Sequence, residues 1–171
     1  MTTAAPGTVP EAEVFRHQAH ITHQVVHLNV DGVSQEESLI QPAGGGNCLN
    51  WVVGHLVAIY DQALPVLGKE PVREKGELKR SDRGSPPLRD PAEARELGEL
   101  MAAWDEASRR FDAGLAGLPA EVLDRPVPHS PAGNPDETVR SLLGTILFHQ
   151  AYHAGQTGLL RRIAGKEGAI P

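Results

Sequence analysis

Hydrophobic residues recur every three or four positions over four long stretches of this sequence, which is the spacing of helices with one buried face. No stretch alternates apolar and polar residues as a half-buried strand would, and no segment is repeated. Helices are therefore expected over about residues 11–30, 48–67, 91–115 and 135–164. Turns and two long loops rich in Gly and Pro would join them. This pattern predicts an all-α four-helix bundle and leaves its topology open.

Residues that favour helix ends mark most of these boundaries. Ser34 and Glu37 have the spacing of a capping box, which predicts a short capped turn after the first helix. Gly165 is expected to end the last helix. Further N-caps are predicted ahead of the second, third and fourth helices: Asn47, Asp90 (followed by Pro91 and Glu93) and Asn134 (followed by Pro135 and Glu137).

The apolar stripes also predict which side of each helix faces the core. They are Val14, Ile21, Val25 and Leu28 in the first helix; Leu49, Val52, Leu56, Ile59 and Ala63 in the second; Ala94, Leu97, Met101, Trp104, Ser108, Phe111 and Leu115 in the third; and Val139, Leu142, Ile146, Leu160 and Ile163 in the fourth.

At 171 residues the chain is long enough for one domain with its own core. We expect a flexible tail over residues 1–10 and a single bundle domain over residues 11–171. The formal charge of -6 argues against a nucleic-acid partner, because phosphate binding requires clustered Lys and Arg. One cysteine, no signal sequence and no membrane-spanning run predict a soluble, cytoplasmic protein with no membrane partner.

Three histidines point at or beside the interior of the predicted bundle. His149 and His153 are one helical turn apart within the apolar face of the last helix, and His55 lies at the edge of the apolar face of the second. Burying an imidazole is costly unless its nitrogens are bonded, and a divalent metal ion would bond both neutral rings of the pair. A third histidine from a facing helix would leave one coordination position for water or substrate, as in catalytic zinc sites.

The spacing His-x-x-x-His is by itself equally consistent with two packed or solvated histidines. Gln150 stands where the metalloprotease helix HExxH has its glutamate, so that motif and its general base are excluded. Gln156 is expected to hold a ligand imidazole or a metal-bound water. Trp51 and Tyr152 could line the pocket, although packing alone would explain both. The sequence does not indicate which residue, if any, is catalytic.

Two segments resemble the signature regions of the DinB-like superfamily (the DinB/YfiT group of four-helix proteins). NCLNWVVGHLVAIYDQAL, with Asn47, Trp51 and His55, resembles the second helix of that family. ETVRSLLGTILFHQAYHAGQTGLLRRIAGK resembles its last helix, in which His-x-x-x-His-x-Gly-Gln is the hallmark. The hallmark positions are occupied here by His149, His153, Gly155 and Gln156.

The resemblance implies a four-helix bundle that binds a divalent metal ion, zinc or nickel, through His55, His149 and His153, often as a homodimer. It further implies an S-transferase in which the metal activates a low-molecular-weight thiol, such as bacillithiol or mycothiol, toward a small-molecule substrate. Other relatives are labelled metal-dependent hydrolases, so a hydrolase in which the metal activates water remains an alternative. A non-catalytic dimeric binding or stress-response protein with a structural metal is the third possibility.

The first predicted helix carries four histidines beside its apolar stripe. They are His17, His20, His23 and His27. The shared face could form a second metal site or a pH-sensitive interface. A solvated face would explain the same pattern. This histidine-rich helix and the proline-bearing connection over residues 68–90 are departures from the family pattern, and they leave the substrate undetermined.

Overall fold

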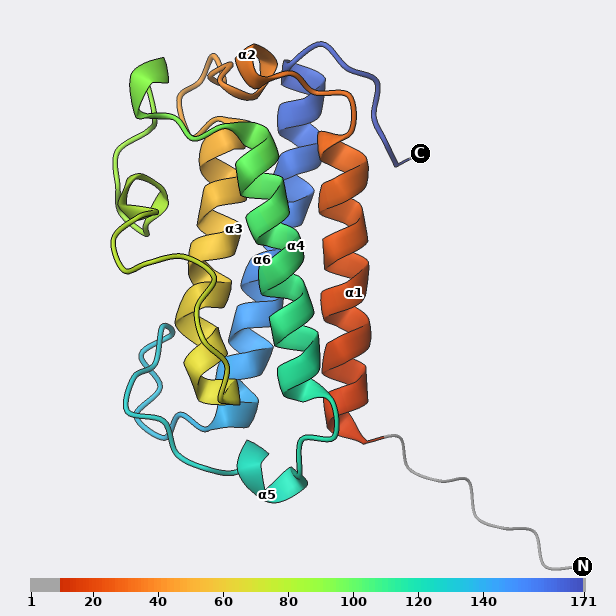
Figure 1. Cartoon of the computed structure of the whole chain (residues 1–171), viewed down its shortest axis with the longest axis vertical. Coiled ribbons are helices and arrows are strands. Elements are labelled where there is room, and N and C mark those ends of the chain that lie inside the picture. The colour runs from red at the N-terminus through yellow and green to blue at the C-terminus, as the bar shows by residue number, and fades with distance from the viewer. Residues whose placement is uncertain (1–9, 171) are drawn as a thin grey trace, which may run out of the picture.

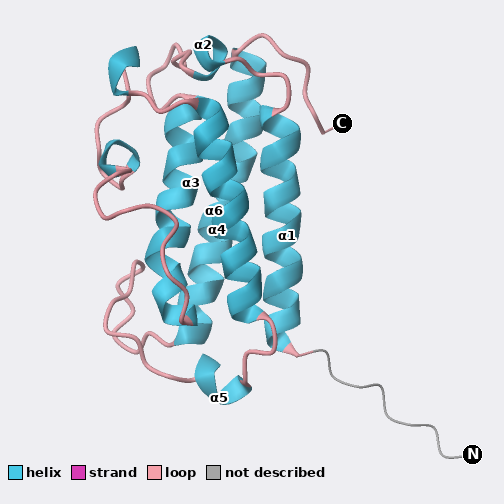
Figure 2. Ribbon diagram, viewed as in Figure 1, coloured by secondary structure: helices cyan, strands magenta, loops and turns pink. Residues whose placement is uncertain are grey.

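The computed structural model describes residues 10–170, and within that span all regular structure is helical (Figure 2). The helices of this span are α1 (Glu11–Val30), α2 (Gln35–Ser38), α3 (Leu49–Ala63), η1 (Leu64–Leu67), η2 (Lys79–Ser81), η3 (Pro91–Glu93), α4 (Leu97–Leu115), α5 (Ala120–Leu123) and α6 (Val139–Ile163), where η marks a 3-10 helix. The predicted all-α bundle with long connecting loops is confirmed. Of the expected tail, residues 1–9 lie outside the described part of the chain.

The four long helices pack side by side in the ring order α1, α4, α3, α6 (Figure 1). In Figure 1, α1 and α6 run toward the end of the bundle that carries α2, whereas α3 and α4 run away from it. The consecutive helices α3 and α4 are therefore parallel, and the chain has to return along the bundle between them. Residues 68–96, which we call the crossover, make this return. The topology is thus a bundle with a long crossover connection.

The crossover packs on the outer side of α3 and closes the core there. Its side chains Leu78 and Leu88 are buried in the same hydrophobic cluster as the residues of α3. As a result, α3 is buried nearly all round, including Val53, Val57 and Tyr60, which lie off the predicted core face. A helix covered on both sides can hold polar side chains away from water.

The other faces of α3 join α4 through stacked aromatic rings. The rings of Tyr60 and Trp104 are 5.1 Å apart between centroids, and those of Tyr60 and Phe111 are 4.5 Å apart. All three side chains are fully buried. Stacked aromatic pairs at these separations stabilise a core by about 0.5–1.5 kcal/mol beyond the area they bury.

The predicted core face of α1 is wrong. The expected residues Val14, Ile21 and Leu28 are 46%, 46% and 51% exposed, and Val25 is only partly buried. The residues of α1 that are buried are Ala12, Phe15, Ala19, Thr22, Val26, Asn29 and Val30. This face is small and partly polar, so a search for large apolar residues selects the wrong side. The buried side-chain amide of Asn29 has hydrogen-bond partners, because it donates to the Ala154 carbonyl and the Thr157 hydroxyl of α6.

The other three predicted faces are largely confirmed. The expected residues that are buried are Leu49, Val52, Leu56 and Ala63 of α3; Leu97, Trp104, Phe111 and Leu115 of α4; and Val139, Leu142, Ile146 and Leu160 of α6. Ile163, in the last turn of α6, is 36% exposed instead. Among the described residues, no helix combines the length and the apolar character that crossing a bilayer requires.

Two of the predicted N-caps are displaced. The helix α3 begins after Cys48 rather than after Asn47, and Cys48 makes no side-chain cap. The helix α6 begins after Thr138, which forms a capping box with Ser141, and not after Asn134. The Asn134 side chain accepts a hydrogen bond from the backbone two residues on, at 3.0 Å. It therefore caps a local turn that the chain does not continue as a helix.

Asp90 also forms its predicted cap without starting a long helix. Its side chain does accept a backbone hydrogen bond at the start of η3, but η3 ends after one turn and α4 begins only after Glu96. A cap satisfies nearby N–H groups whether a short or a long helix follows. The predicted capping box of Ser34 and Glu37 is confirmed at α2, and α6 ends before Gly165, which has a positive φ of 81°.

Gly114 lies where α4 meets η1, and a Cβ atom there would come within 2.8 Å of the Leu67 Cβ. Alanine is the better helix former by about 1 kcal/mol, but overpacking of this kind costs about 1–3 kcal/mol. We expect Gly114→Ala to lower the free energy of unfolding by up to about 2 kcal/mol in urea denaturation, the overpacking cost less the gain in helix propensity. Gly144→Ala is the matched control, since a Cβ at this exposed position of α6 meets nothing within 4 Å. Equal stability of the two variants would contradict the close packing at Gly114.

Candidate metal centre

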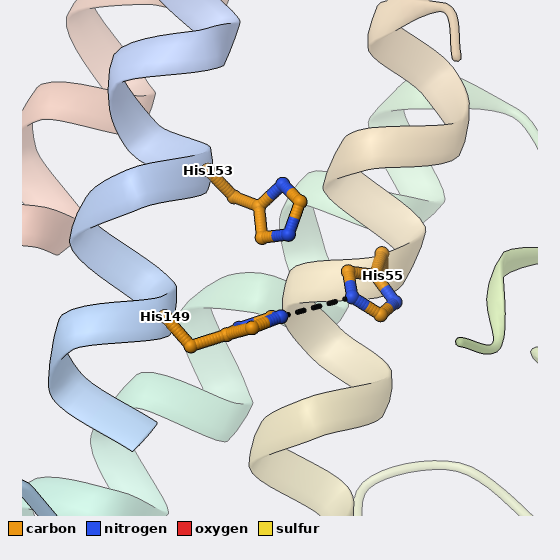
Figure 3. A group of neighbouring side chains, drawn as sticks. All are labelled: His55, His149 and His153. Carbon is orange, nitrogen blue, oxygen red and sulfur yellow. Dashed lines mark hydrogen bonds between the residues drawn. The ribbon is translucent and has the colours of Figure 1, made fainter. Parts of the chain in front are cut away.

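Three imidazoles from two helices meet where α3 and α6 pack together (Figure 3). His55 projects from α3, and His149 and His153 project toward it from successive turns of α6. One nitrogen atom of each ring lies within 4.8 Å of the corresponding atoms of the other two. The structure therefore brings together all three predicted ligands in a group that could hold a metal ion.

The spacing of the rings suits a small divalent ion. The Nε2 atoms of His55 and His149 are 3.1 Å apart, and the centroids of the three rings are 4.5–5.0 Å apart. Two nitrogen atoms bound to zinc at about 2.0–2.1 Å with tetrahedral angles lie about 3.3 Å from each other. An ion could therefore be accommodated with little movement of the side chains.

Hydrogen bonds to the outer ring nitrogens set the orientation of two of the imidazoles. Nδ1 of His55 donates to the backbone carbonyl of Ser81 at 2.7 Å, and Nδ1 of His153 donates to Oε1 of Gln156 at 2.8 Å. Since each acceptor requires the proton on Nδ1, the Nε2 atom of each ring is left with a lone pair. This is how ligand histidines are usually held, with the second nitrogen bonded outside the centre.

The third ring, His149, is less completely satisfied. Its Nδ1 atom is buried and has no hydrogen-bond partner among the described residues. Its Nε2 atom faces the lone pair on Nε2 of His55 at 3.1 Å. Two facing lone pairs repel, so this position requires either a proton on His149 or a cation between the rings. The donor set and its geometry thus fit a bound metal ion.

The surroundings keep all three imidazoles neutral. Burial lowers the pKa of His55, an effect that its hydrogen bond to Ser81 partly offsets. Burial, together with the charges of His153, His55 and Arg83, lowers the pKa of His149 to about 4. Burial also lowers the pKa of His153, against the opposing effect of the Gln156 hydrogen bond. Neutral imidazole is the form that binds metal, so the centre is ready to bind at neutral pH.

The crossover supplies one wall of the centre. A Cβ atom at position 54 would come within 2.5 Å of the Ser81 Oγ, so only Gly54 allows the crossover this close to α3. Trp51 stacks on His55, with 4.7 Å between ring centroids, and its Nε1 donates to the Ser85 hydroxyl at 3.0 Å. The predicted pocket residue Trp51 therefore supports the outer side of the His55 ring and is itself held by the crossover.

Two charged residues of the crossover also act on the centre, and sequence reasoning missed both. The charge of Asp82 favours protonation of His55, and Arg83 disfavours protonation of His55 and His149. Asp82 and Arg83 lie in a loop without periodicity, so nothing in the sequence connects them with the histidines. The mid-helix glycine Gly54 was the one available signal, because such a residue often marks a close backbone approach.

Of the other predicted site residues, Gln156 is hydrogen-bonded to the three-histidine group, whereas Tyr152 borders it from the outside of α6. Gln156 accepts a hydrogen bond from His153, one of the three predicted ligands. The Tyr152 ring lies edge-on to His153, with 5.1 Å between centroids, but it is 65% exposed and borders the outside of α6. The histidines of α1 do not belong to this group, and two of them, His23 and His27, contribute to a separate one.

Comparisons with known proteins agree with this architecture. A family model described as the DinB superfamily matches residues 18–157, a span that contains all three clustered histidines. The chain is also similar to a conserved protein from Enterococcus faecalis whose crystal structure is known, with 16% sequence identity and a TM-score of 0.72. The match covers 93% of this chain and 100% of that one, and at this identity it shows the fold alone. No curated protein matches the sequence.

The low pKa of His149 makes the metal-free protein sensitive to mild acid. An unfolded histidine has a pKa of about 6.5, so between pH 6.5 and about 4 the unfolded chain binds more protons than the folded one. We expect the free energy of unfolding, measured by urea denaturation in the presence of a chelator, to fall as the pH falls through this window. His149→Gln should make the fall shallower, whereas His129→Gln, at an exposed loop position, should leave it unchanged. An identical slope in parent and His149→Gln would show that burial does not depress this pKa.

Proposed function

The chain belongs to the DinB superfamily, and from this premise we propose that it is a metal-dependent transferase that uses a low-molecular-weight thiol. In this proposal His55, His149 and His153 bind one divalent ion, zinc or nickel. The thiol is bacillithiol, mycothiol or a similar compound, and it is transferred to a small electrophilic substrate. The observation that carries the proposal is the convergence of three neutral imidazoles, two of them fixed with their Nε2 lone pairs inward.

The number of protein ligands favours catalysis over a purely structural role. Structural zinc sites are generally closed by four protein ligands, whereas the group here has three, from α3 and α6. A fourth position would be left for a thiol. When bound, the ion would lower the pKa of that thiol so that it reacts as a thiolate at neutral pH. The thiolate sulfur would then bond to the electrophilic carbon while the leaving group departs with its electron pair.

The chain's own residues would orient the rings and bind the reactants. Ser81 and Gln156 hold the outer nitrogens of two ligand imidazoles. Trp51 fixes the plane of His55 and shields that side from water. Arg83 is exposed and lies near enough to affect His55 and His149, so its guanidinium can bind an anionic group of the thiol or the substrate.

A hydrolase remains the second candidate because of Asp82. The carboxylate of this residue lies close enough to His55 to favour its protonation, and it could accept a proton from a water molecule activated at the centre. This candidate predicts ester or amide hydrolysis that needs the metal and Asp82 but no thiol. Thiol-independent activity that disappears in Asp82→Asn would favour it over the transferase.

We also propose that the protein is a homodimer formed through α1 and α6. These neighbouring helices expose large apolar side chains: Val14, Ile21 and Leu28 on α1, and Phe148, Tyr152 and Leu159 on α6. Exposed apolar side chains on adjacent helices are typical of contact surfaces between subunits. Light scattering gives the mass directly, and a value near 18.3 kDa, that of one chain, would contradict the dimer.

The metal site can be tested by measuring metal content in protein purified without a histidine tag or chelator. We expect the bound zinc or nickel to fall by one equivalent in His149→Ala. Gln156→Leu should weaken metal affinity by about 10–100-fold, because it removes the acceptor that orients His153. His129→Gln is the control and should change nothing. A metal content that is the same in His149→Ala and the parent would rule out the proposed ligands.

The thiol reaction can be tested with the zinc-loaded protein, a panel of low-molecular-weight thiols and an aryl halide as electrophile. We expect transfer that is lost in His149→Ala. Arg83→Gln should raise the KM for an anionic thiol several-fold with little change in kcat, whereas Arg89→Gln, an exposed arginine further along the crossover, should behave like the parent. Metal-loaded protein that neither binds any thiol nor supports transfer would contradict the transferase. A sharp loss of thermal stability in His149→Ala, with no thiol transfer or hydrolysis by the parent protein, would instead indicate a structural metal.

A further inference from the structure

A second group of histidines lies in a groove between α1 and α4. The groove has a volume of about 890 Å³, and its walls include His20, His23, His27 and Asp105. In the ring of four helices, α1 and α4 are the pair opposite to α3 and α6. This groove is therefore on the other side of the bundle from the three-histidine centre, and the two groups share no residue.

His23, His27 and Asp105 converge on one point in this groove. His23 and His27 are one turn apart on α1, and their Nε2 atoms lie 2.8 and 2.5 Å from the same carboxylate oxygen, Oδ1 of Asp105 on α4. The ring of His23 also stacks on the buried ring of Trp104, with 5.8 Å between centroids. Two helices and an aromatic support thus bring together two imidazole nitrogens and one carboxylate oxygen within 4.8 Å of one another.

We infer that His23, His27 and Asp105 form a second binding site for a divalent transition-metal ion such as zinc. Two imidazoles and one carboxylate are a common ligand set for zinc, and water would complete the tetrahedron. Zinc-bound nitrogen and oxygen atoms lie about 3.3 Å apart, so the ligand atoms would need to separate by about 0.5–0.8 Å. Side-chain rotation can supply this, because all three side chains are at least a quarter exposed.

The neighbouring charges leave this group available for a cation. The two arginines that line the groove are each engaged by another carboxylate: Arg16 by Asp112 at 2.7 Å, and Arg109 by Glu106 at 2.7 Å. Among the described residues, the ion-pair partners of Asp105 are the two histidines. A cation placed among these three ligands would therefore not displace an arginine.

The exposure of the second group predicts weaker and more rapidly reversible binding than at the more buried three-histidine centre. Asp105 has a side-chain exposure of 51% and His27 of 42%. Water competes more effectively for exposed ligands. Within residues 10–170, the side-chain hydrogen bonds of His23 and His27 are those of Nε2 with Asp105, and no acceptor holds their Nδ1 atoms as Ser81 and Gln156 do at the first centre. The ion should consequently fill the three-histidine centre first and the second site at higher free metal concentration.

Equilibrium dialysis of the full, tag-free chain against zinc, with bound metal counted by plasma mass spectrometry, tests this inference. We expect close to two equivalents in the parent, one in Asp105→Asn, one in His149→Ala and none in the double variant. His20→Gln, a histidine of the same groove outside the group, is the matched control and should retain two. Circular dichroism verifies that each variant is folded.

The outcomes separate this site from the three-histidine centre. One equivalent that is lost in Asp105→Asn but kept in His149→Ala would support the second site and contradict the proposed function. Equal zinc content in Asp105→Asn and the parent would overturn the second site, whatever His149→Ala does. A similar loss in His20→Gln and in Asp105→Asn would also overturn it, because it would indicate unspecific binding by the histidine-rich face.

Discussion

The parallel arrangement of α3 and α4 is the constraint on which the rest of the structure depends. Because these helices are consecutive, the chain must travel back along the bundle, and the crossover does so over the outer side of α3. This path removes α3 from water and brings the Ser81 carbonyl to Nδ1 of His55. Gly54 permits the approach, because a side chain there would collide with Ser81. The geometry of the three-histidine site therefore depends on the crossover, a segment with little regular structure.

Some polar atoms of α3 and α6 are buried without a hydrogen-bond partner among the described residues. Nδ1 of His149, Oε1 of Gln150 and the Tyr60 hydroxyl are buried without a partner among the described residues. Each unsatisfied group of this kind costs about 1–3 kcal/mol. The buried Asn29 and Thr157, between α1 and α6, are by contrast hydrogen-bonded to each other. The unpaired Nδ1 of His149 belongs to the three-histidine group itself, where binding of a ligand can offset such a cost.

The two histidine groups show how surroundings decide what the same side chain can do. At the α3–α6 interface, burial lowers the pKa values of the imidazoles, and Ser81 and Gln156 fix the rings of His55 and His153 with the Nε2 lone pair inward. In the α1–α4 groove the rings are more exposed, and a carboxylate takes the place of the third imidazole. Three neutral, largely buried imidazoles held by hydrogen bonds favour tight and oriented binding of a ligand. An exposed set with one negative ligand favours reversible binding.

The sequence by itself determined the long helices, their order and the shared face of His149 and His153, because helical periodicity and the i, i+4 spacing are local properties of the chain. The resemblance to the DinB-like superfamily rested on the same residues, and the match over residues 18–157 confirms it. Only the tertiary structure decided which face of α1 is buried, since Asn29 is tolerated inside through partners more than a hundred residues away. It alone brought Asp82 and Arg83 to the centre, because the position of the crossover depends on contacts of its own side chains, such as Leu78 and Leu88, with residues that are distant in the sequence.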